Sequence, residues 1–153
     1  MGKYDLVESA LKAMGAEFFF DAVAIRPGKP AVFGMCQGKP VFGLPGNPVS
    51  TMVTFELFVA PAIDLLSGAE VRALPLVEAR LAEAMKEKTG LTHFLPARVE
   101  WHGAVPEVKA LRWQGSGDIA ALARANCFLA VPADREKMEI GESVSVLLRK
   151  DVV

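Results

Sequence analysis

The chain has 153 residues, a formal net charge of −1 and a hydrophobic fraction of 52%, which suits one ordinary domain or two small ones and excludes a disordered protein. This near-neutral balance argues against sequence-independent nucleic-acid binding, which needs a strongly basic surface. The opening residues include no apolar segment of the signal-peptide kind, and no run approaches the ~18 consecutive apolar residues of a membrane span. We therefore expect a cytoplasmic protein with no nucleic-acid or membrane partner.

Cysteine and histidine are too sparse for a disulfide framework or a histidine metal centre. Cys36 and Cys127 are isolated in sequence, so we expect reduced thiols in the core. His93 and His102 lie nine positions apart in one predicted strand or hairpin. That odd spacing directs them to opposite faces and makes them a poor metal-binding pair.

The first part of the chain alternates helical and strand patterns. Apolar spacing predicts a helix over residues 4–15 that ends at a glycine, followed by a buried strand over residues 17–25. The next apolar runs, residues 31–35 and 40–44, predict an antiparallel hairpin, with Gly38 at a positive φ in the turn.

A long helix is predicted after the sequence GLPGNPVS of residues 43–50. Asn47 is a favoured N-cap residue, Pro48 suits the first helical position, and Pro61 should kink or split the helix. An α/β layer needs a strand before its first helix to form a right-handed crossover. Because the first helix begins within about four residues of Met1, we expect the front of this α/β domain to be missing.

The pattern changes near residues 71–75, after which short β runs dominate. One helix is predicted at residues 118–125, with Ser116 as candidate cap and Asn126 as candidate stop. The predicted strands are residues 76–85, 93–101, 108–113, 127–131 and 143–148. We therefore place a linker at residues 71–74, between an α/β segment (1–70) and a mostly-β segment (75–153).

The junction at residues 43–50 carries the sharpest chemical signal. Free N–H groups at a helix start, glycines that allow close approach and the Ser50 hydroxyl suit a phosphate or another oxyanion. The alternative is a rigid turn leading into a well-capped helix, with no ligand.

Three other positions have both a functional and a structural interpretation. Arg26 and Lys29 lie on a stiff, proline-bounded loop and either bind an anion or are solvated surface charges. Asp5 is either a Mg²⁺ ligand or a surface carboxylate that complements the helix dipole. Ser116 either contacts a small ligand group or caps a helix. No Ser/His/Asp or Cys/His arrangement stands out, so covalent catalysis is not expected.

Taken together, these segments resemble the C-terminal part of the MoeA family of molybdopterin molybdenumtransferases, whose eukaryotic counterpart is the gephyrin E domain. The resemblance spans essentially the whole chain. It implies the second half of an α/β/α molybdopterin-binding domain over residues 1–70 and a β-barrel-like C-terminal domain over residues 75–153. The segments that carry it are GKYD (2–5), IRPGKP (25–30), GLPGNPVS (43–50), GSG (115–117) and LARAN (122–126).

The resemblance implies insertion of molybdenum from molybdate into adenylylated molybdopterin, with Mg²⁺ and release of AMP. By position it assigns a catalytic role to Asp5, Arg26 and Lys29, with Asp5 also the metal ligand. It assigns substrate binding to Pro45, Gly46, Asn47, Pro48, Ser50 and Ser116.

The chain also departs from the family pattern. Family members carry further domains and a glycine-rich turn upstream, so we expect a truncated C-terminal part that is inactive alone and forms a homodimer or larger oligomer through uncovered apolar surface. Leu91 stands where members often carry arginine, with Arg98 as a substitute candidate.

Two other interpretations stay open at this point. The first is a non-catalytic dimerisation or partner-anchoring module of the gephyrin type. The second is a fragment of a MogA-like protein, which the β segment after residue 75 argues against.

Overall fold

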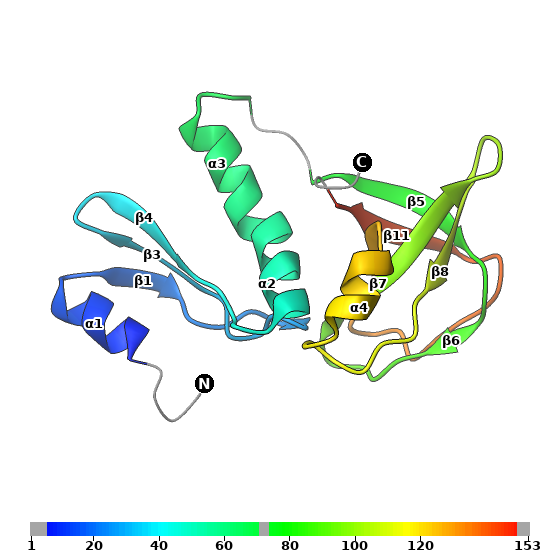
Figure 1. The fold of residues 1–153 in the computed structure, drawn as a ribbon, viewed down its shortest axis with the longest axis horizontal. Helices are drawn as coiled ribbons and strands as arrows, with labels where there is room; N and C mark the ends of the chain where they lie inside the picture. The colour runs from blue at the N-terminus through cyan, green and yellow to red at the C-terminus, as the bar shows by residue number, and fades with distance from the viewer. Residues whose placement is uncertain (1–5, 71–73, 150–153) are drawn as a thin grey trace.

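The computed structural model describes residues 6–70 and 74–149, which form two parts joined side by side (Figure 1). In the first part, a short helix and a three-stranded antiparallel sheet in the order β1-β3-β4 lie beside one long helix. Its elements are α1 (Val7–Ala13), β1 (Glu17–Phe20), β3 (Val32–Cys36), β4 (Lys39–Gly43), α2 (Pro48–Thr54), a π-helical turn η1 (Phe55–Val59) and α3 (Ala60–Leu66).

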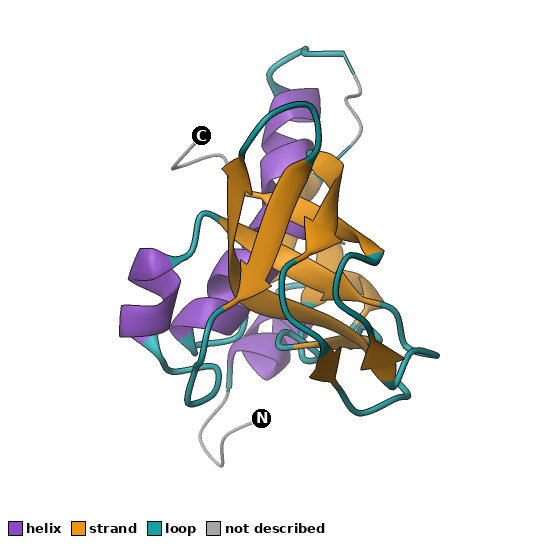
Figure 2. Ribbon diagram, turned by 90° about the vertical axis from the view of Figure 1, so that its right-hand side faces the viewer, coloured by secondary structure: helices purple, strands orange, loops and turns teal. Residues whose placement is uncertain are grey.

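The second part is a closed β-barrel with one covering helix (Figure 2). Its sheet has the strand order β2-β7-β8-β5-β11-β9, and the additional pairing of β7 with β9 closes five of these strands into a ring. The elements are β2 (Ile25–Arg26), β5 (Leu76–Leu81), β6 (Met85–Lys86), β7 (Thr92–Trp101), β8 (Pro106–Ala110), α4 (Ile119–Arg124), β9 (Cys127–Val131), β10 (Lys137–Met138) and β11 (Ser143–Leu148). The predicted class, an α/β part followed by a mostly-β barrel-like part, is confirmed.

The hairpin of β3 and β4 forms as predicted. Val32 pairs with Gly43 and Cys36 with Lys39, and the two turn residues, Gln37 and Gly38, have φ of 51° and 76°. Two consecutive positive φ values give the turn type whose twist matches that of the flanking strands.

The predicted buried strand over residues 17–25 is wrong. β1 ends at Phe20, its side chains alternate between exposed and half-buried, and Phe19 is 57% exposed. The chain bends at Asp21 and Ala24, and the Val23 N–H donates to the Lys29 carbonyl, beyond β2. β2 then leaves the first sheet and pairs in parallel with β7 of the barrel. Composition alone could not show this change of sheet, because an apolar run suits either pairing.

The long helix is interrupted just before Pro61, as predicted. Pro61 has no N–H to donate to the carbonyl four residues earlier. The π-helical turn η1, Phe55–Val59, ends two positions before it, and α3 begins at Ala60. The predicted N-cap role of Asn47 is only partly right: Asn47 occupies the N-cap position, but its side chain makes no capping hydrogen bond. The Thr51 hydroxyl instead donates to the carbonyls of Asn47 and Pro45.

The helical stretch Pro48–Leu66, which includes the π-helical turn, has 19 residues and a mean hydropathy of 1.6, and it is long and apolar enough to cross a membrane by length and composition. The core helix of a soluble protein passes the same test. Here Val49 and Val53 are completely buried, and the carboxylate of Glu56 is 2% exposed within the same helix. The first half of the helix is thus a packed element of this fold.

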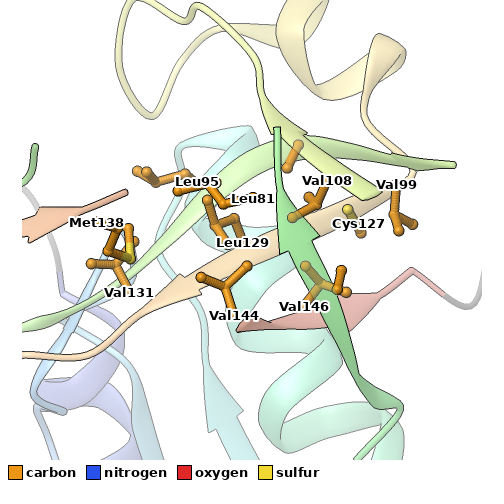
Figure 3. Packing of buried hydrophobic residues seen from close by; sticks show 12 residues of the cluster. Leu81, Leu95, Val99, Val108, Cys127, Leu129, Val131, Met138, Val144 and Val146 are labelled. Carbon is orange, nitrogen blue, oxygen red and sulfur yellow. The ribbon is translucent and has the colours of Figure 1, made fainter. Parts of the chain in front are cut away.

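Two buried clusters hold the molecule together. The first fills the barrel and includes Leu81, Leu95, Val108, Leu129 and Val146 (Figure 3). The second joins the two parts, because Val49 and Val53 of α2 pack with buried residues of the barrel part, namely Phe94, Leu122, Phe128 and Leu147. By contrast, α1 contains no buried residue. The division of the chain at residues 71–74 stays a prediction, and this second cluster crosses it in space.

Several predicted boundaries in the barrel need correction. The strand predicted over residues 76–85 is two strands, β5 and β6, and the strand predicted over 108–113 ends at Ala110. Asp118 caps α4 in place of Ser116, since its carboxylate accepts the Ala121 N–H at 2.9 Å. The helix ends at Arg124, and the Asn126 side chain bonds both backbone groups of Val99, at 2.8 and 2.9 Å.

The cysteine and histidine predictions agree with the structure. Cys36 and Cys127 are free and buried, and burial raises the pKa of the Cys127 thiol to about 12. His93 is buried against the Glu87 carboxylate, while the side chain of His102 is 70% exposed.

Candidate functional site

A cavity of about 490 Å³ opens where the first part meets the barrel. Three loops contribute to it: the basic loop after β2, the loop before α2 and the loop before α4, with Leu91 added from the segment before β7. Its lining residues are Ile25, Arg26, Pro27, Gly28, Lys29, Pro30, Pro45, Asn47, Ser50, Leu91, Trp113, Gly115 and Ser116.

The barrel holds the basic loop in place. Arg26 lies opposite His93 in the parallel pairing of β2 with β7, and the Thr92 N–H donates to the Ala24 carbonyl at 3.1 Å. The side chains of Arg26 and Lys29 are exposed, while Gly28 between them is buried. Two cationic side chains therefore face solvent at the cavity, on a loop whose backbone is held by pairing with β7.

Gly28 also lets this loop approach α2. Its φ is +115°, and a Cβ at this position would lie 2.7 Å from Cγ2 of Thr54. A side chain would therefore be strained and would also clash with the helix. Arg26 and Lys29 thus line the same cavity as Ser50, which lies one turn before Thr54 on α2.

The start of α2 is tied to the loop before α4. The Val49 N–H donates to the Ser116 carbonyl at 3.0 Å, and the Thr51 N–H donates to the Asn47 carbonyl at 2.9 Å. These two donors of the first turn thus have acceptors inside the protein. The Ser50 side chain also lines the cavity and is 4% exposed.

Asp118 fixes the other side of this contact. Its carboxylate accepts the Ala121 N–H and, at 3.0 Å, the Gln114 N–H. These backbone hydrogen bonds lower the pKa of Asp118. The loop of Gly115 and Ser116 is thereby held between a capped helix and α2.

The cavity brings together six of the nine residues predicted from the sequence: Arg26, Lys29, Pro45, Asn47, Ser50 and Ser116. Gly46 and Pro48, the neighbours of Asn47 in sequence, are not among the residues that line the cavity. Asp5 lies outside the described residues.

Arg98, the substitute candidate for the arginine replaced by Leu91, is not at this cavity. It lies on β7, bonds Glu100 at 2.9 Å and lines a separate surface hollow with His102. Leu91 itself lines the cavity. The substitution therefore adds an apolar side chain to the lining, and Arg98 does not restore the charge.

Trp113 is the lining residue that the sequence prediction missed. One residue, Gln114, separates it from the GSG segment, and the sequence pattern predicts only the end of a strand there. An aromatic residue so close to a glycine-rich segment is the sequence signal that could have identified Trp113 as a lining residue.

The described residues do not provide the Mg²⁺ ligands that the family resemblance implies. The described lining residues include no carboxylate. Residues 6–70 and 74–149 also contain no group of three or more His, Cys, Asp or Glu side chains that could hold a metal ion. Carboxylate oxygens are the ligands that Mg²⁺ favours. We therefore assign no step to the metal.

Two family descriptions match adjoining stretches of the chain. Residues 1–65 match "Probable molybdopterin binding domain", and residues 78–148 match "MoeA C-terminal region (domain IV)". The two matches fall on the first part and on the barrel respectively. The cavity lies between them.

Curated relatives and solved structures agree with these matches. Proteins named molybdopterin molybdenumtransferase from Staphylococcus aureus and Staphylococcus epidermidis are 32% and 30% identical over 97% of this chain. A solved molybdopterin biosynthesis MoeA protein from Pyrococcus horikoshii is 33% identical over 95% of this chain, with a TM-score of 0.76. A molybdenum cofactor biosynthesis protein from Pyrococcus furiosus is 31% identical over 95% of this chain, with a TM-score of 0.67.

The chain spans about a third of the length of these curated relatives, 35% in both cases. It covers 35% of the P. horikoshii chain and 55% of the P. furiosus chain. The matches nevertheless run through both parts of the fold and through all the loops that line the cavity. The chain therefore belongs to the MoeA family, whose members act in molybdenum cofactor biosynthesis.

Proposed function

We propose that the cavity binds the anionic groups of adenylylated molybdopterin and molybdate during Mg²⁺-dependent molybdenum insertion and release of AMP. The observation that carries this proposal is the meeting of Arg26, Lys29 and Ser50 in one cavity whose described lining has no carboxylate. The protein as a whole has a net charge of −1, so this concentration of positive charge is local. Phosphate and molybdate both carry negative charge on several oxygens, which suits two cations and hydroxyl donors.

The residues of this chain contribute charge and position. Arg26 can bond two oxygens of one anion through its planar guanidinium, whereas Lys29 supplies a compact charge on a flexible stem. The hydroxyls of Ser50 and Ser116 can donate to further oxygens. Holding phosphate and molybdate in a fixed relation favours a reaction that needs no protein nucleophile.

The test compares binding of molybdate and of AMP by calorimetry. Arg26→Ala and Lys29→Ala should each weaken binding about ten-fold, since a hydrogen bond to a charged group is worth about 1.5–3 kcal/mol. Lys39→Ala is the matched control, because Lys39 is an exposed lysine in the β3–β4 hairpin, away from the lining. Equal affinities in all variants would remove the basic loop from the site.

Catalysis by this chain alone is a separate part of the proposal. We expect it to release AMP from adenylylated molybdopterin more slowly than a full-length relative does, because its described cavity residues supply cations and hydroxyls but no metal ligand. Loss of one preorganised donor typically costs about 10²–10³ in rate. Turnover equal to that of the relative would contradict this expectation.

We also propose that the protein is cytoplasmic and forms a homodimer or larger oligomer. Exposed apolar side chains on α1 and α3 support association, in particular Val7, Ile63 and Leu66, which are 60%, 51% and 68% exposed.

The same exposed surfaces favour a second candidate function, a non-catalytic module that binds a protein partner. Sedimentation at about 100 μM tests association: a single monomeric species would contradict it. Absence of both molybdate and AMP binding would favour the partner-binding module.

A further inference from the structure

Trp113 gives the cavity a second chemical character. The polar side chains belong to the basic loop, to the start of α2 and to the loop before α4. Ile25, Leu91 and Trp113 add apolar surface to the same lining. A site for a small oxyanion alone has no use for apolar walls. The volume of about 490 Å³ instead falls within the ~300–1,000 Å³ of pockets that take whole organic ligands.

The position of Trp113 is rigid. Its side chain packs against both buried clusters, so it stands where the barrel core meets the core shared with α2. The backbone is held on both sides, since the Leu111 N–H donates to the Pro96 carbonyl at 2.9 Å and the Gln114 N–H donates to Asp118 at 3.0 Å. Trp113 is thus a half-buried indole that packs on two cores and also lines the cavity.

Trp113 is the natural partner in this cavity for a planar ring of a ligand. Trp113 is the single aromatic residue among the described lining residues, and the other tryptophan, Trp101, is 52% exposed at the far end of β7. Indole rings favour stacked contacts with planar π systems, and such pairs add about 0.5–1.5 kcal/mol to the burial of area. A ligand that fits the lining therefore has a planar ring at one end and an anionic group at the other.

We propose that Trp113 is a binding residue that stacks against the planar nitrogen heterocycle of this ligand while Arg26 and Lys29 hold its anionic group. The inference rests on the proposed function, in which the ligand carries two such rings, pterin and adenine. The chemistry of a planar π system is common to both rings. Which one meets Trp113 is decided by the arms of the test.

The experiment uses the fluorescence of Trp113 itself. The Trp101→Phe variant leaves Trp113 as the only tryptophan, because the chain has two. This variant is titrated separately with AMP, neopterin monophosphate, inorganic phosphate and molybdate, with free N-acetyltryptophanamide as the control for light absorbed by the ligands. We expect the ligand whose ring stacks, either AMP or the pterin, to quench the Trp113 fluorescence strongly. Phosphate and molybdate should change the fluorescence little.

Two substitutions then separate stacking from packing. Trp113→Leu should weaken binding of the quenching ligand about five- to ten-fold, as the energy of a stacked pair converts to affinity, and should leave affinity for phosphate and molybdate unchanged. Trp113→Phe keeps an aromatic ring and should weaken binding by less, about two- to three-fold. Circular dichroism and urea unfolding show whether each variant remains folded at the temperature of the assay.

The outcomes distinguish the inference from the proposed function. If phosphate and molybdate bind through Arg26 and Lys29 but neither AMP nor the pterin quenches Trp113, the stacking role is overturned and the anion site stands. Equal loss of affinity for inorganic anions and ring-containing ligands in Trp113→Leu would also overturn it, because the effect would then be structural. If none of the four probes binds, both proposals fail.

Discussion

The two parts of the molecule bury their apolar residues to very different extents. The barrel closes on itself and fills its interior with a cluster of its own, whereas α1 has no buried residue and β1 leaves Phe19 57% exposed. The first part is anchored mainly where α2 packs on the barrel. Similar apolar patterns in sequence thus lead to a self-sufficient core in one part and to exposed surface in the other.

The largest expected effect breaks the barrel core. Leu129 is completely buried, so Leu129→Ala should lower the free energy of unfolding by about 2–5 kcal/mol through lost burial and the cavity that remains. Val7→Ala on α1 is the matched control, since Val7 is 60% exposed, and should change it by less than about 0.5 kcal/mol. Urea unfolding measures both. Equal effects would show that α1 is as well packed as the barrel.

A smaller effect concerns the junction of the two parts. Gly28→Ala forces a residue with a Cβ into a φ of +115° and against Thr54, which should cost about 1–3 kcal/mol. Gly46→Ala is the control, because a Cβ there would meet nothing within 4 Å. Comparison of their urea midpoints tests whether the basic loop is packed against α2. A fully stable Gly28→Ala protein would contradict that packing.

The smallest effect is a pH dependence within the barrel part. Because hydrogen bonds from Ala121 and Gln114 lower the pKa of Asp118, the ionised group stabilises the fold above its unfolded-state pKa, near 3.8. That contribution is lost as the pH falls through the lower pKa of the folded state.

Thermal unfolding between about pH 2 and 6 measures this loss. Asp118→Asn should flatten the acid limb of the stability curve, whereas Asp21→Asn, which removes an exposed carboxylate in the β1–β2 connection, should not. An unchanged acid limb in Asp118→Asn would show that the cap makes no pH-dependent contribution.

Local sequence signals were sufficient for much of the fold. The β3–β4 hairpin was predictable because its turn chemistry is confined to two residues, and the break before Pro61 because proline lacks an N–H. The transfer of β2 to the barrel was not, since it depends on a parallel pairing with β7 over sixty residues later in the chain. Nor was the shift of the α4 cap from Ser116 to Asp118, because both residue types favour that position.

The site was predictable to a similar degree. Motifs identified the basic loop, the GLPGNPVS loop and Ser116 separately, and the structure brings residues from all three to one cavity. The role of Trp113 in the lining was not predictable, because a tryptophan at the end of an apolar run is more often a core residue. Its exposure to the cavity follows from the meeting of two cores, which is a tertiary feature without a local sequence signature.

The core cluster shared by α2 and the barrel also has a consequence for exchanging halves between related proteins. A crossover at residues 71–74 would fall between α3 and β5 and would cut none of the described helices or strands. It would nevertheless unite Val49 and Val53 from one parent with the Phe128 and Leu147 positions of the other. Hybrids should therefore fold stably only when the two parents have side chains of similar volume at these positions. The two halves are best exchanged together.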